Sequence, residues 1–490
     1  MASSPSSRAV PAVGGAVGFL VVMEFGSGLL QGWFPPLLAR IGSDYGVDAA
    51  SLNWVSVLYL LMTVAFVPVI GKLGDLYGHK RLLLVTVSLV ALGSLVVAFA
   101  PNFTVLLIGR ALQAPLGAFL PLEFAIVRSR NPEASGRSIG KLVGALTIGG
   151  ALGAMVSGIL LSVVDNLTVV LLVPAAFMLL CIPVVAWLVP ESDSRTPGRV
   201  DWPGAALLTA GLLLTLTGIS NASSWGWVSL ATLGCLLGGL ALLALWVQVE
   251  RRVEHPLVDL RVLCTSGIGL PIVAGGLFGA QMFGSQTAGS LFIMNKPEAY
   301  GYGLGLSSAV VGLVFLVLAL CTFVGTVLAD RWAARSGVKT VLVIGALLGA
   351  VSFVGMILAS AAAVPFLVCM AVGSFGNGLL MGAIPSVVVK RAPEDSVAVA
   401  SALYNTTRTA AGSVSGAVFA LVMASFLTTV TVQGNPTTIS SSTSHAVVWG
   451  LCAALCVGVA LLALRFRQAA AAPGELDAVD STHELQENKA

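Results

Sequence analysis

Four ionisable residues interrupt long apolar stretches of this sequence: Glu24, Arg110, Glu123 and Arg408. A charge at the centre of a membrane costs at least about 2.5–3.5 kcal/mol on insertion scales, so such residues usually have a partner or a function. A carboxylate can take up a proton, whereas an arginine stays charged in proteins and can only bias a neighbouring carboxylate. The sequence therefore offers Glu24 first and Glu123 second as proton-coupling sites, with Arg110 as the residue that switches them.

Each of these assignments has a structural alternative. Arg110 could form a static pair with Glu24 that holds two helices together. Glu123 could reach the basic cluster that begins at Arg128, near the end of its own helix, or could anchor a cationic substrate. Arg408 could satisfy backbone carbonyls instead of contacting substrate. Glu24 lies about 20 Å along its helix from Pro11, at 1.5 Å per residue, and is therefore expected near the midplane.

Composition indicates a membrane protein. Of the 490 residues, 57% are hydrophobic and only 10% are charged, whereas a soluble domain has about 25% charged residues. The net charge of +3 gives no basis for nucleic-acid binding. The seven cysteines have neither metal-ligand nor disulfide spacing. No catalytic triad or phosphate loop is present and the histidines are expected in loops or tails, so we predict no enzyme, no metal and no cofactor beyond a proton gradient.

Apolar windows of about 20 residues, the length that crosses a bilayer, predict an all-α membrane protein with fourteen spans in the order six, two, six. The expected spans are 11–31, 52–71, 82–100, 103–127, 138–162, 167–189, 203–220, 226–247, 267–289, 306–329, 340–360, 364–389, 397–425 and 446–466. The predicted units are a cytosolic N-terminal tail (1–10), a six-helix bundle (11–189), a linker with two extra helices (190–265), a second six-helix bundle (266–467) and a disordered cytosolic tail (468–490).

The distribution of basic residues supports this count. If both ends are cytosolic, nearly all of the 25 Lys and Arg residues fall in cytosolic segments, as the positive-inside rule requires. Only Arg40 and Lys296 fall on the other side, and Arg110 and Arg408 lie within helices. A wrong number of spans would reverse this alternation from the point of the error onward.

Two loops repeat one design. GKLGDLYGHKR (71–81) links the second and third spans, and GTVLADRWAARSGVK (325–339) links the equivalent spans of the second bundle. Asp75 and Asp330 occupy matching places, each at a helix end before basic residues. Topology alone explains a basic loop but not the paired aspartates. Duplicated halves are typical of secondary transporters, whose substrate site lies between them. A helix-end aspartate that accepts backbone N–H groups can also hold one side of such a protein shut. The candidate latch residues are Gly71, Gly74, Asp75, Lys80, Arg81, Asp330 and Arg331.

The first of these loops resembles the loop signature of the major facilitator superfamily, and the fourteen-span layout resembles its drug:proton antiporter branch. Further stretches that match this branch are Asp201-Trp202-Pro203-Gly204, Trp225-Gly226-Trp227, Pro256-Leu257-Val258-Asp259-Leu260-Arg261, and Asn405 with Arg408, Gly412 and Ser413. The segment 107–119 resembles the family motif whose arginine, here Arg110, is implicated in proton transfer. The resemblance covers nearly the whole chain except the tails.

Two departures from the family pattern stand out. Leu76 occupies a position that is usually basic, which predicts a weaker latch. In the fifth span, Ala154 and Ser157 replace a proline and a glycine of the antiport motif, while the small residues Gly149 and Gly153 remain. Close helix packing is therefore still expected there.

The resemblance implies a proton-coupled exporter of small apolar or amphipathic compounds in the cell membrane, working as a monomer by alternating access. An importer or facilitator on the same fold is the first alternative, and a non-transporting receptor or assembly partner is the second. The expected partners are the lipid bilayer, a small-molecule substrate and protons. Candidate residues for the substrate cavity are Gln113, Gln281, Asn377, Asn405 and Arg408.

Overall fold

The structure is a computed structural model that describes part of the chain. The described residues are 13–47, 49–130, 135–191, 201–253, 256, 267–306, 308–393, 396–432 and 435–466. The predicted tails (1–10 and 468–490) and residues 257–261 of the family-like segment lie outside them.

The first bundle is built from six spans in chain order. Its elements are α1 (Val13–Trp33), η1 (Pro35–Leu37), α2 (Leu38–Tyr45), α3 (Ala49–Tyr77), α4 (His79–Ala98), α5 (Phe103–Gln113), η2 (Ala114–Ala118), α6 (Phe119–Arg130), α7 (Ser135–Val163) and α8 (Leu167–Leu188). The fourth span, expected as one helix over 103–127, is interrupted by the 3₁₀ turn η2. Pro115 lies in that turn, and a proline removes a helical hydrogen bond and displaces the preceding turn.

The two inserted helices are α9 (Trp202–Trp225) and α10 (Leu230–Glu250). Asp201 caps α9 by accepting the Gly204 N–H, and Ser229 caps α10 by accepting the Thr232 N–H. The helix α9 packs against both α3 and the later helix α17, with Leu208 close to Val399 in one apolar cluster and Leu216 close to Val64 in another. The inserted pair therefore lies beside a boundary where the two bundles meet.

The second bundle repeats the six-span arrangement. Its elements are α12 (Gly269–Met294), α13 (Pro297–Tyr300), α14 (Ser308–Ser336), α15 (Val338–Leu358), α16 (Ala363–Arg391), α17 (Val397–Ser425), β1 (Leu427–Val432), β2 (Asn435–Ser440) and α18 (Ser442–Leu464). Gly78 and Gly337 precede the equivalent helices α4 and α15 with positive φ angles of 104° and 82°. Only glycine adopts such angles without strain, so the repeated loops share one backbone turn.

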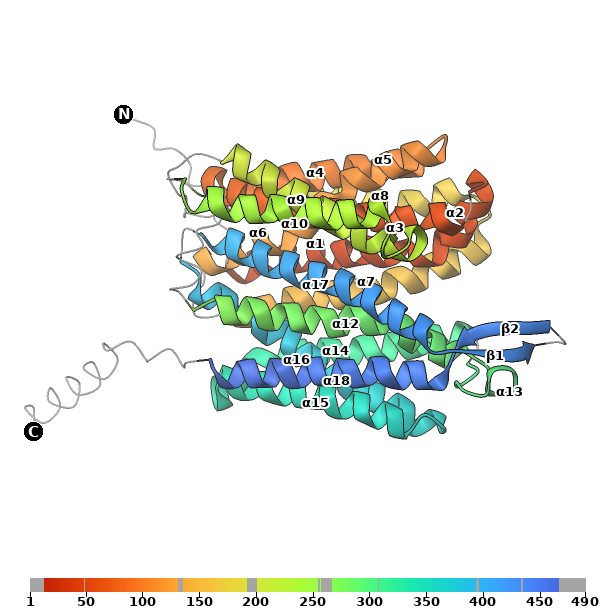
Figure 1. Cartoon of the computed structure of the whole chain (residues 1–490). Coiled ribbons are helices and arrows are strands. Elements are labelled where there is room, and N and C mark those ends of the chain that lie inside the picture. Colours follow the sequence, from red (N-terminus) through yellow and green to blue (C-terminus); the bar gives the residue numbers. More distant parts are fainter. Residues whose placement is uncertain are drawn as a thin grey trace, which may run out of the picture.

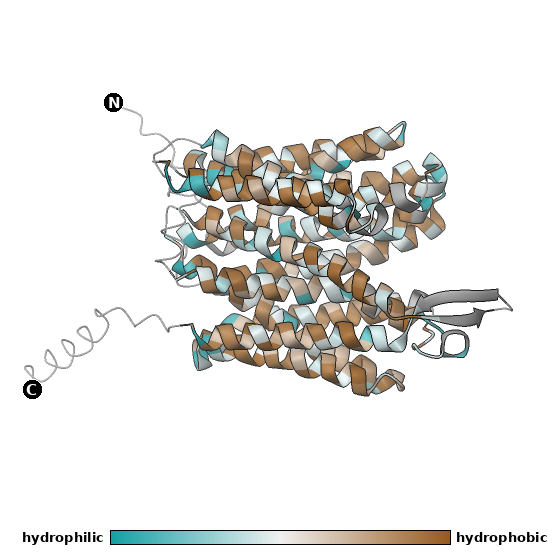
Figure 2. Ribbon diagram, viewed as in Figure 1, coloured by the Kyte–Doolittle hydropathy of each residue, from teal (hydrophilic) through white to brown (hydrophobic). Residues whose placement is uncertain are grey.

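Within the described ranges, thirteen helices are long and apolar enough to cross a membrane. The Gly-rich α12, with 26 residues, is the remaining long helix and runs through the bundle beside α18 (Figure 1). The helix surfaces are apolar along the middle of the molecule and hydrophilic toward its ends (Figure 2). Apolar side chains such as Leu180, Val351 and Val364 are more than 60% exposed. The all-α membrane fold with two six-helix bundles and two inserted helices is confirmed.

The two ends of the bundle differ. The helix α1 begins and α18 ends on the same side, which we call the terminal face, and the β1–β2 pair projects from the opposite side, which we call the hairpin face (Figure 1). The polar character of segment 430–445 predicts a loop. The segment instead forms most of an antiparallel hairpin, with Leu427 opposite Ser440, and the first turn of α18. Alternating Thr and Val residues in 427–432 have the period of a strand.

Candidate functional site

Asp75 joins the two bundles at the terminal face. It lies near the end of α3 and is almost fully buried. Its Oδ1 accepts the Ala398 N–H at 3.3 Å and its Oδ2 accepts the Val399 N–H at 3.1 Å. Both donors are in the first turn of α17, where the helix dipole favours a negative charge. Gly71 makes this approach possible, because an added Cβ would lie 2.9 Å from the Ala402 Cβ and 3.1 Å from the Ala398 carbonyl oxygen.

His79 supplies a partner that the sequence analysis missed. Its Nε2 lies 2.9 Å from the Asp75 Oδ1, and both side chains are buried. The expectation that the histidines lie in loops or tails is therefore wrong for His79, in the first turn of α4, and for His445, which is buried in α18. The i,i+4 spacing of Asp75 and His79 was a usable signal, but the break at Gly78 hid it. Lys80 donates its backbone N–H to Glu191, and the side chains of Arg81 and Arg331 are exposed.

Asp330 mirrors Asp75 in the second bundle. It lies near the end of α14, and its Oδ1 is so close to Gly136, in the first turn of α7, that no Cβ would fit there. Lys390 Nζ lies 3.6 Å from the same oxygen. Each aspartate thus contacts the N-terminal turn of the equivalent helix in the other bundle. These two mirrored contacts are the structural counterpart of the repeat in the sequences of the two loops.

Arg128 adds a third connection at the terminal face. Its Nη1 donates to the carbonyl oxygens of Ala392, at 2.6 Å, and Val389, at the end of α16. Arg130 donates to the Glu191 carbonyl oxygen. These two arginines therefore bind backbone carbonyls, and the alternative in which they hold the Glu123 carboxylate does not occur in this structure.

Glu24 and Glu123 face each other inside the first bundle, from α1 and α6. The two residues are 1% and 0% exposed to solvent, and their carboxyl groups are close enough to interact electrostatically. Ser27, one turn after Glu24, also lies beside that carboxyl group. Among the described residues, no group outside the pair makes a hydrogen bond to the buried Glu24 Oε2 or to either Glu123 carboxyl oxygen. The two carboxyl groups named as coupling candidates are thus one site rather than two.

Arg110 is held away from this pair. Its Nε donates to the Val55 carbonyl oxygen at 3.0 Å, and its Nη1 donates to the Gln113 Oε1 at 2.7 Å. The guanidinium carbon lies 3.7 Å from the centre of the Phe34 ring and 4.5 Å from that of Tyr59. The static pair of Arg110 with Glu24 is therefore not formed. Tyr59 interacts electrostatically with both Arg110 and Glu24.

Arg408 and Asn405 lie on α17 where it meets the first bundle. Arg408 Nη2 donates to the Asn405 Oδ1 at 3.0 Å, and the Asn405 Nδ2 donates to the Gly117 carbonyl oxygen at 3.3 Å. Arg408 Nε is buried without a hydrogen-bond partner in the described part of the chain. These residues line a cavity of only about 10 Å³ between the bundles, which is room for about one water molecule.

The five predicted substrate-cavity residues fall in three places. Arg408 and Asn405 lie between the bundles. Gln113 is inside the first bundle, where it binds Arg110 and donates to the Ser94 Oγ at 2.9 Å. Gln281 and Asn377 are inside the second bundle, joined by a 2.8 Å hydrogen bond. Asn405 and Arg408 line the small cavity between the bundles, whereas Asn377 lines a different cavity inside the second bundle.

The α1–α7 contact explains the glycines around Glu24 and in the fifth span. A Cβ at Gly28 would clash with the Leu146 carbonyl oxygen, and one at Gly149 or Gly153 would clash with the backbone of α1. The close packing expected from the surviving small residues is confirmed.

A family model described as Major Facilitator Superfamily matches residues 20–283 and 277–487. The chain belongs to the Major Facilitator Superfamily. It is 29% identical over 429 residues to the cephamycin export protein CmcT of Amycolatopsis lactamdurans, covering 84% of each chain. It is 28% identical over 393 residues to the tetracenomycin C resistance and export protein of Streptomyces glaucescens, covering 79% of this chain and 71% of the relative.

A solved structure confirms the fold. The crystal structure of the human organic anion transporter MFSD10 (TETRAN) superposes with a TM-score of 0.67 at 15% identity, covering 92% of this chain and 100% of that one. Two relatives are named as export proteins. Because this chain belongs to a superfamily of transporters, it is a membrane transporter rather than an enzyme. The two bundles are joined at the terminal face by contacts of Asp75, Asp330 and Arg128, and the cavity at Arg408 is small. In a transporter of this superfamily, this arrangement is a state that is closed at the terminal face.

Proposed function

We propose that this protein is a secondary active exporter that exchanges protons for small apolar or amphipathic compounds. The export direction is supported by the names of two relatives, one a cephamycin export protein and the other a tetracenomycin C resistance and export protein. Proton coupling is supported by the Glu24–Glu123 pair, which is the observation that carries the proposal.

The pair is suited to holding a proton because its surroundings offer no compensation for two charges. Two unit charges 4 Å apart repel by about 4 kcal/mol at an effective dielectric of 20, and burial adds the cost of removing each from water. Within the described residues, no ion pair joins either carboxyl group to a cation. In the state that is closed at the terminal face, the Glu24–Glu123 pair therefore keeps at least one proton.

Release of that proton requires a cation or water to reach the pair. Arg110 is a buried cation of the same bundle, and Tyr59 contacts its guanidinium group and interacts electrostatically with Glu24. The two hydrogen bonds of Arg110, to Val55 and Gln113, can be exchanged if α1 and α5 move relative to each other. An Arg110 that reaches Glu24 would stabilise the carboxylate and expel the proton. The two positions of Arg110 would then belong to the two conformations of the transport cycle.

We assign the terminal face to the cytosol and the protein to the cell membrane. Apart from Arg110 and Arg408 within the spans, the described Lys and Arg residues lie in helix ends and loops at that face, whereas Arg40 and Lys296 lie toward the hairpin face (Figure 1). The positive-inside rule predicts this distribution for cytosolic termini. A potential of 100 mV supplies about 2.3 kcal/mol per charge, which supports a gradient of roughly fortyfold. Export against a gradient therefore needs no nucleotide.

Everted membrane vesicles provide the test. Respiration acidifies the vesicle interior, which a fluorescent pH indicator reports, and compounds are then added to the outer, formerly cytosolic, surface. An antiporter carries the compound inward and protons outward, so the interior becomes more alkaline when a substrate is added. Vesicles that contain Glu24→Gln protein should show no such change.

The same assay distinguishes the alternatives. A facilitator would equilibrate a radiolabelled compound without moving protons, and a proton-linked importer would not alkalinise the interior on external addition. Either result, obtained with a compound that the protein demonstrably transports, would refute the proposal.

A further inference from the structure

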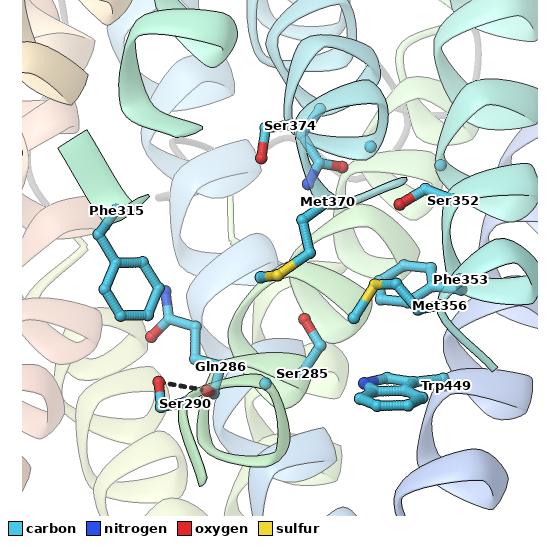
Figure 3. A pocket seen from close by; sticks show the side chains of 14 residues that line it. Ser285, Gln286, Ser290, Phe315, Ser352, Phe353, Met356, Met370, Ser374 and Trp449 are labelled. Atoms are coloured by element: carbon cyan, nitrogen blue, oxygen red, sulfur yellow. Dashed lines mark hydrogen bonds between the residues drawn. The ribbon is translucent and has the colours of Figure 1, made fainter. Parts of the chain in front are cut away.

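A second cavity lies wholly inside the second bundle, away from the Arg408 site. It has a volume of about 130 Å³ and is lined from α12, α14, α15, α16 and α18. Phe315 lies on one side of it and Phe353 and Trp449 lie on the other, with Met370 and Ser285 between them (Figure 3). An engineered cavity of about 150 Å³ in another protein binds benzene, so this space is the size of one aromatic ring.

The chemistry of the lining excludes a charged ligand. None of the residues that line the cavity is ionisable, and an unpaired charge at membrane depth is costly. Three aromatic rings and the thioether sulfurs of Met356 and Met370 face the space. Aromatic rings and methionine sulfur both favour contact with another aromatic ring.

The cavity also offers hydrogen bonds of both kinds. Ser352 Oγ donates its proton to the Cys369 carbonyl oxygen at 2.7 Å, and Ser290 Oγ donates to the Gln286 carbonyl oxygen at 2.8 Å. Their oxygen lone pairs remain as acceptors. Trp449 is only 1% exposed, and its Nε1–H is buried without a partner in the described residues. Leaving a buried donor without a hydrogen-bond partner costs about 1–3 kcal/mol of free energy. A ligand carbonyl that accepts from the donor can recover this free energy.

Gly289 shows that the space is a real void. This α12 residue is buried, yet an added Cβ would meet no atom within 4 Å. Most other buried glycines in the bundle face a helix backbone or a side chain instead, such as Gly325 against Phe375. A larger side chain at Gly289 can therefore fill the cavity without displacing its walls.

We propose that this cavity is a binding subsite for an uncharged aromatic ring that bears a hydrogen-bond acceptor, held by Trp449 and Phe353. The role of this subsite in transport rests on the proposed export function, since the subsite would receive the ring of a neutral substrate. Binding itself can be measured without transport.

The test uses 4-azidobenzamide, a neutral single ring with an amide and a photoreactive azide, on the purified full-length protein. After irradiation, labelled peptides are identified by mass spectrometry. Label is expected on peptides of α12, α15, α16 and α18 that line the cavity, and excess benzamide should suppress it.

Two substitutions sharpen the assignment. Gly289→Leu should lower labelling about tenfold or more, because the filled cavity has no room for the ring. The matched control is Gly312→Leu, at an exposed α14 position that also has open space, and it should label normally. Trp449→Phe keeps a ring but removes the N–H, so it should lower labelling by 4-azidobenzamide about threefold while leaving labelling by phenyl azide unchanged.

Label that maps elsewhere, or labelling of the Gly289→Leu protein at the native level, overturns the proposal. The vesicle assay on the same proteins separates the two inferences. If the native protein exports but its cavity takes no label, the subsite alone is refuted. If the native cavity is labelled but no proton-linked export occurs, the proposed function alone is refuted.

Discussion

His79 Nε2 lies 2.9 Å from the Asp75 Oδ1, and the same carboxylate binds two backbone N–H groups at the start of α17. This buried carboxylate is thereby one of the contacts that tie the first bundle to the second. Leu76 occupies the position where the family usually has a basic residue, and His79 provides a hydrogen-bonding partner for Asp75 one turn later. The predicted latch thus has a side-chain partner for Asp75 at His79, and its strength stays a prediction.

Asp75→Asn should slow transport while leaving substrate affinity within a few-fold. An asparagine keeps the shape but offers one acceptor oxygen instead of two and no charge, and hydrogen bonds to a charged group are worth about 1.5–3 kcal/mol. Turnover in vesicles should therefore fall about tenfold or more, with binding measured separately on purified protein. Asp44→Asn, at an exposed position on the hairpin face, is the control. A normal transport rate would show that the contact with α17 has no part in the cycle.

His79→Leu should destabilise the closed state more than His79→Gln does. Leucine leaves a buried carboxylate oxygen without its side-chain donor, whereas the glutamine amide can still donate to it. The measurement is the distance between spin labels on the terminal ends of α3 and α17, which should lengthen in the leucine variant. Equal distances in both variants would assign the closure to the backbone donors alone.

Gly136→Val should disrupt the contact between Asp330 and the first turn of α7. An added Cβ at this position would collide with the Asp330 Oδ1 and the Ser386 Oγ, so α7 and α14 must separate at the terminal face. We expect loss of transport with normal insertion in the membrane. Gly312→Val, which has open space, should transport normally. If Gly136→Val protein transports as well as the native protein, the mirrored contact of Asp330 does not matter for function.

The spans, the repeat and the family could be predicted from the sequence because each depends on local features: apolar length, basic loops and paired motifs. The partners of the buried charges could not. Whether Glu24 meets Arg110 or Glu123 depends on the relative rotation of α1, α5 and α6, and the 3₁₀ turn at Pro115 changes that rotation. The expected Arg110 partner is replaced by Val55, Gln113 and two rings. A backbone carbonyl such as that of Val55 leaves no signal in a sequence.

The assignment of the terminal face to the cytosol can be checked by cysteine labelling. Arg137 and Arg335 are exposed at the terminal face, and Asp165 is exposed at the hairpin face. In a background without reactive native thiols, Arg137→Cys and Arg335→Cys should resist a membrane-impermeant thiol reagent in intact cells. Asp165→Cys should react. Labelling of either terminal-face cysteine before permeabilisation would reverse the orientation or change the number of spans.

Glu24→Gln should uncouple transport from the proton gradient. Glutamine mimics the protonated carboxyl group permanently, so the protein should still bind substrate and exchange it across the membrane. It should not accumulate substrate against a gradient when a pH difference is imposed, because no proton can be released. Vesicle exchange and uphill accumulation, measured on the same preparation, separate these two abilities.

Glu123→Gln distinguishes the two members of the pair. It leaves the Glu24 carboxyl group but replaces its charged or acidic neighbour with an amide, so uphill transport should continue with an altered pH dependence. Glu298→Gln, at an exposed residue, should leave both rate and pH dependence unchanged. If Glu24→Gln protein still drives uphill transport with the native pH dependence, the pair is a structural contact between α1 and α6. Coupling would then have to reside in other residues.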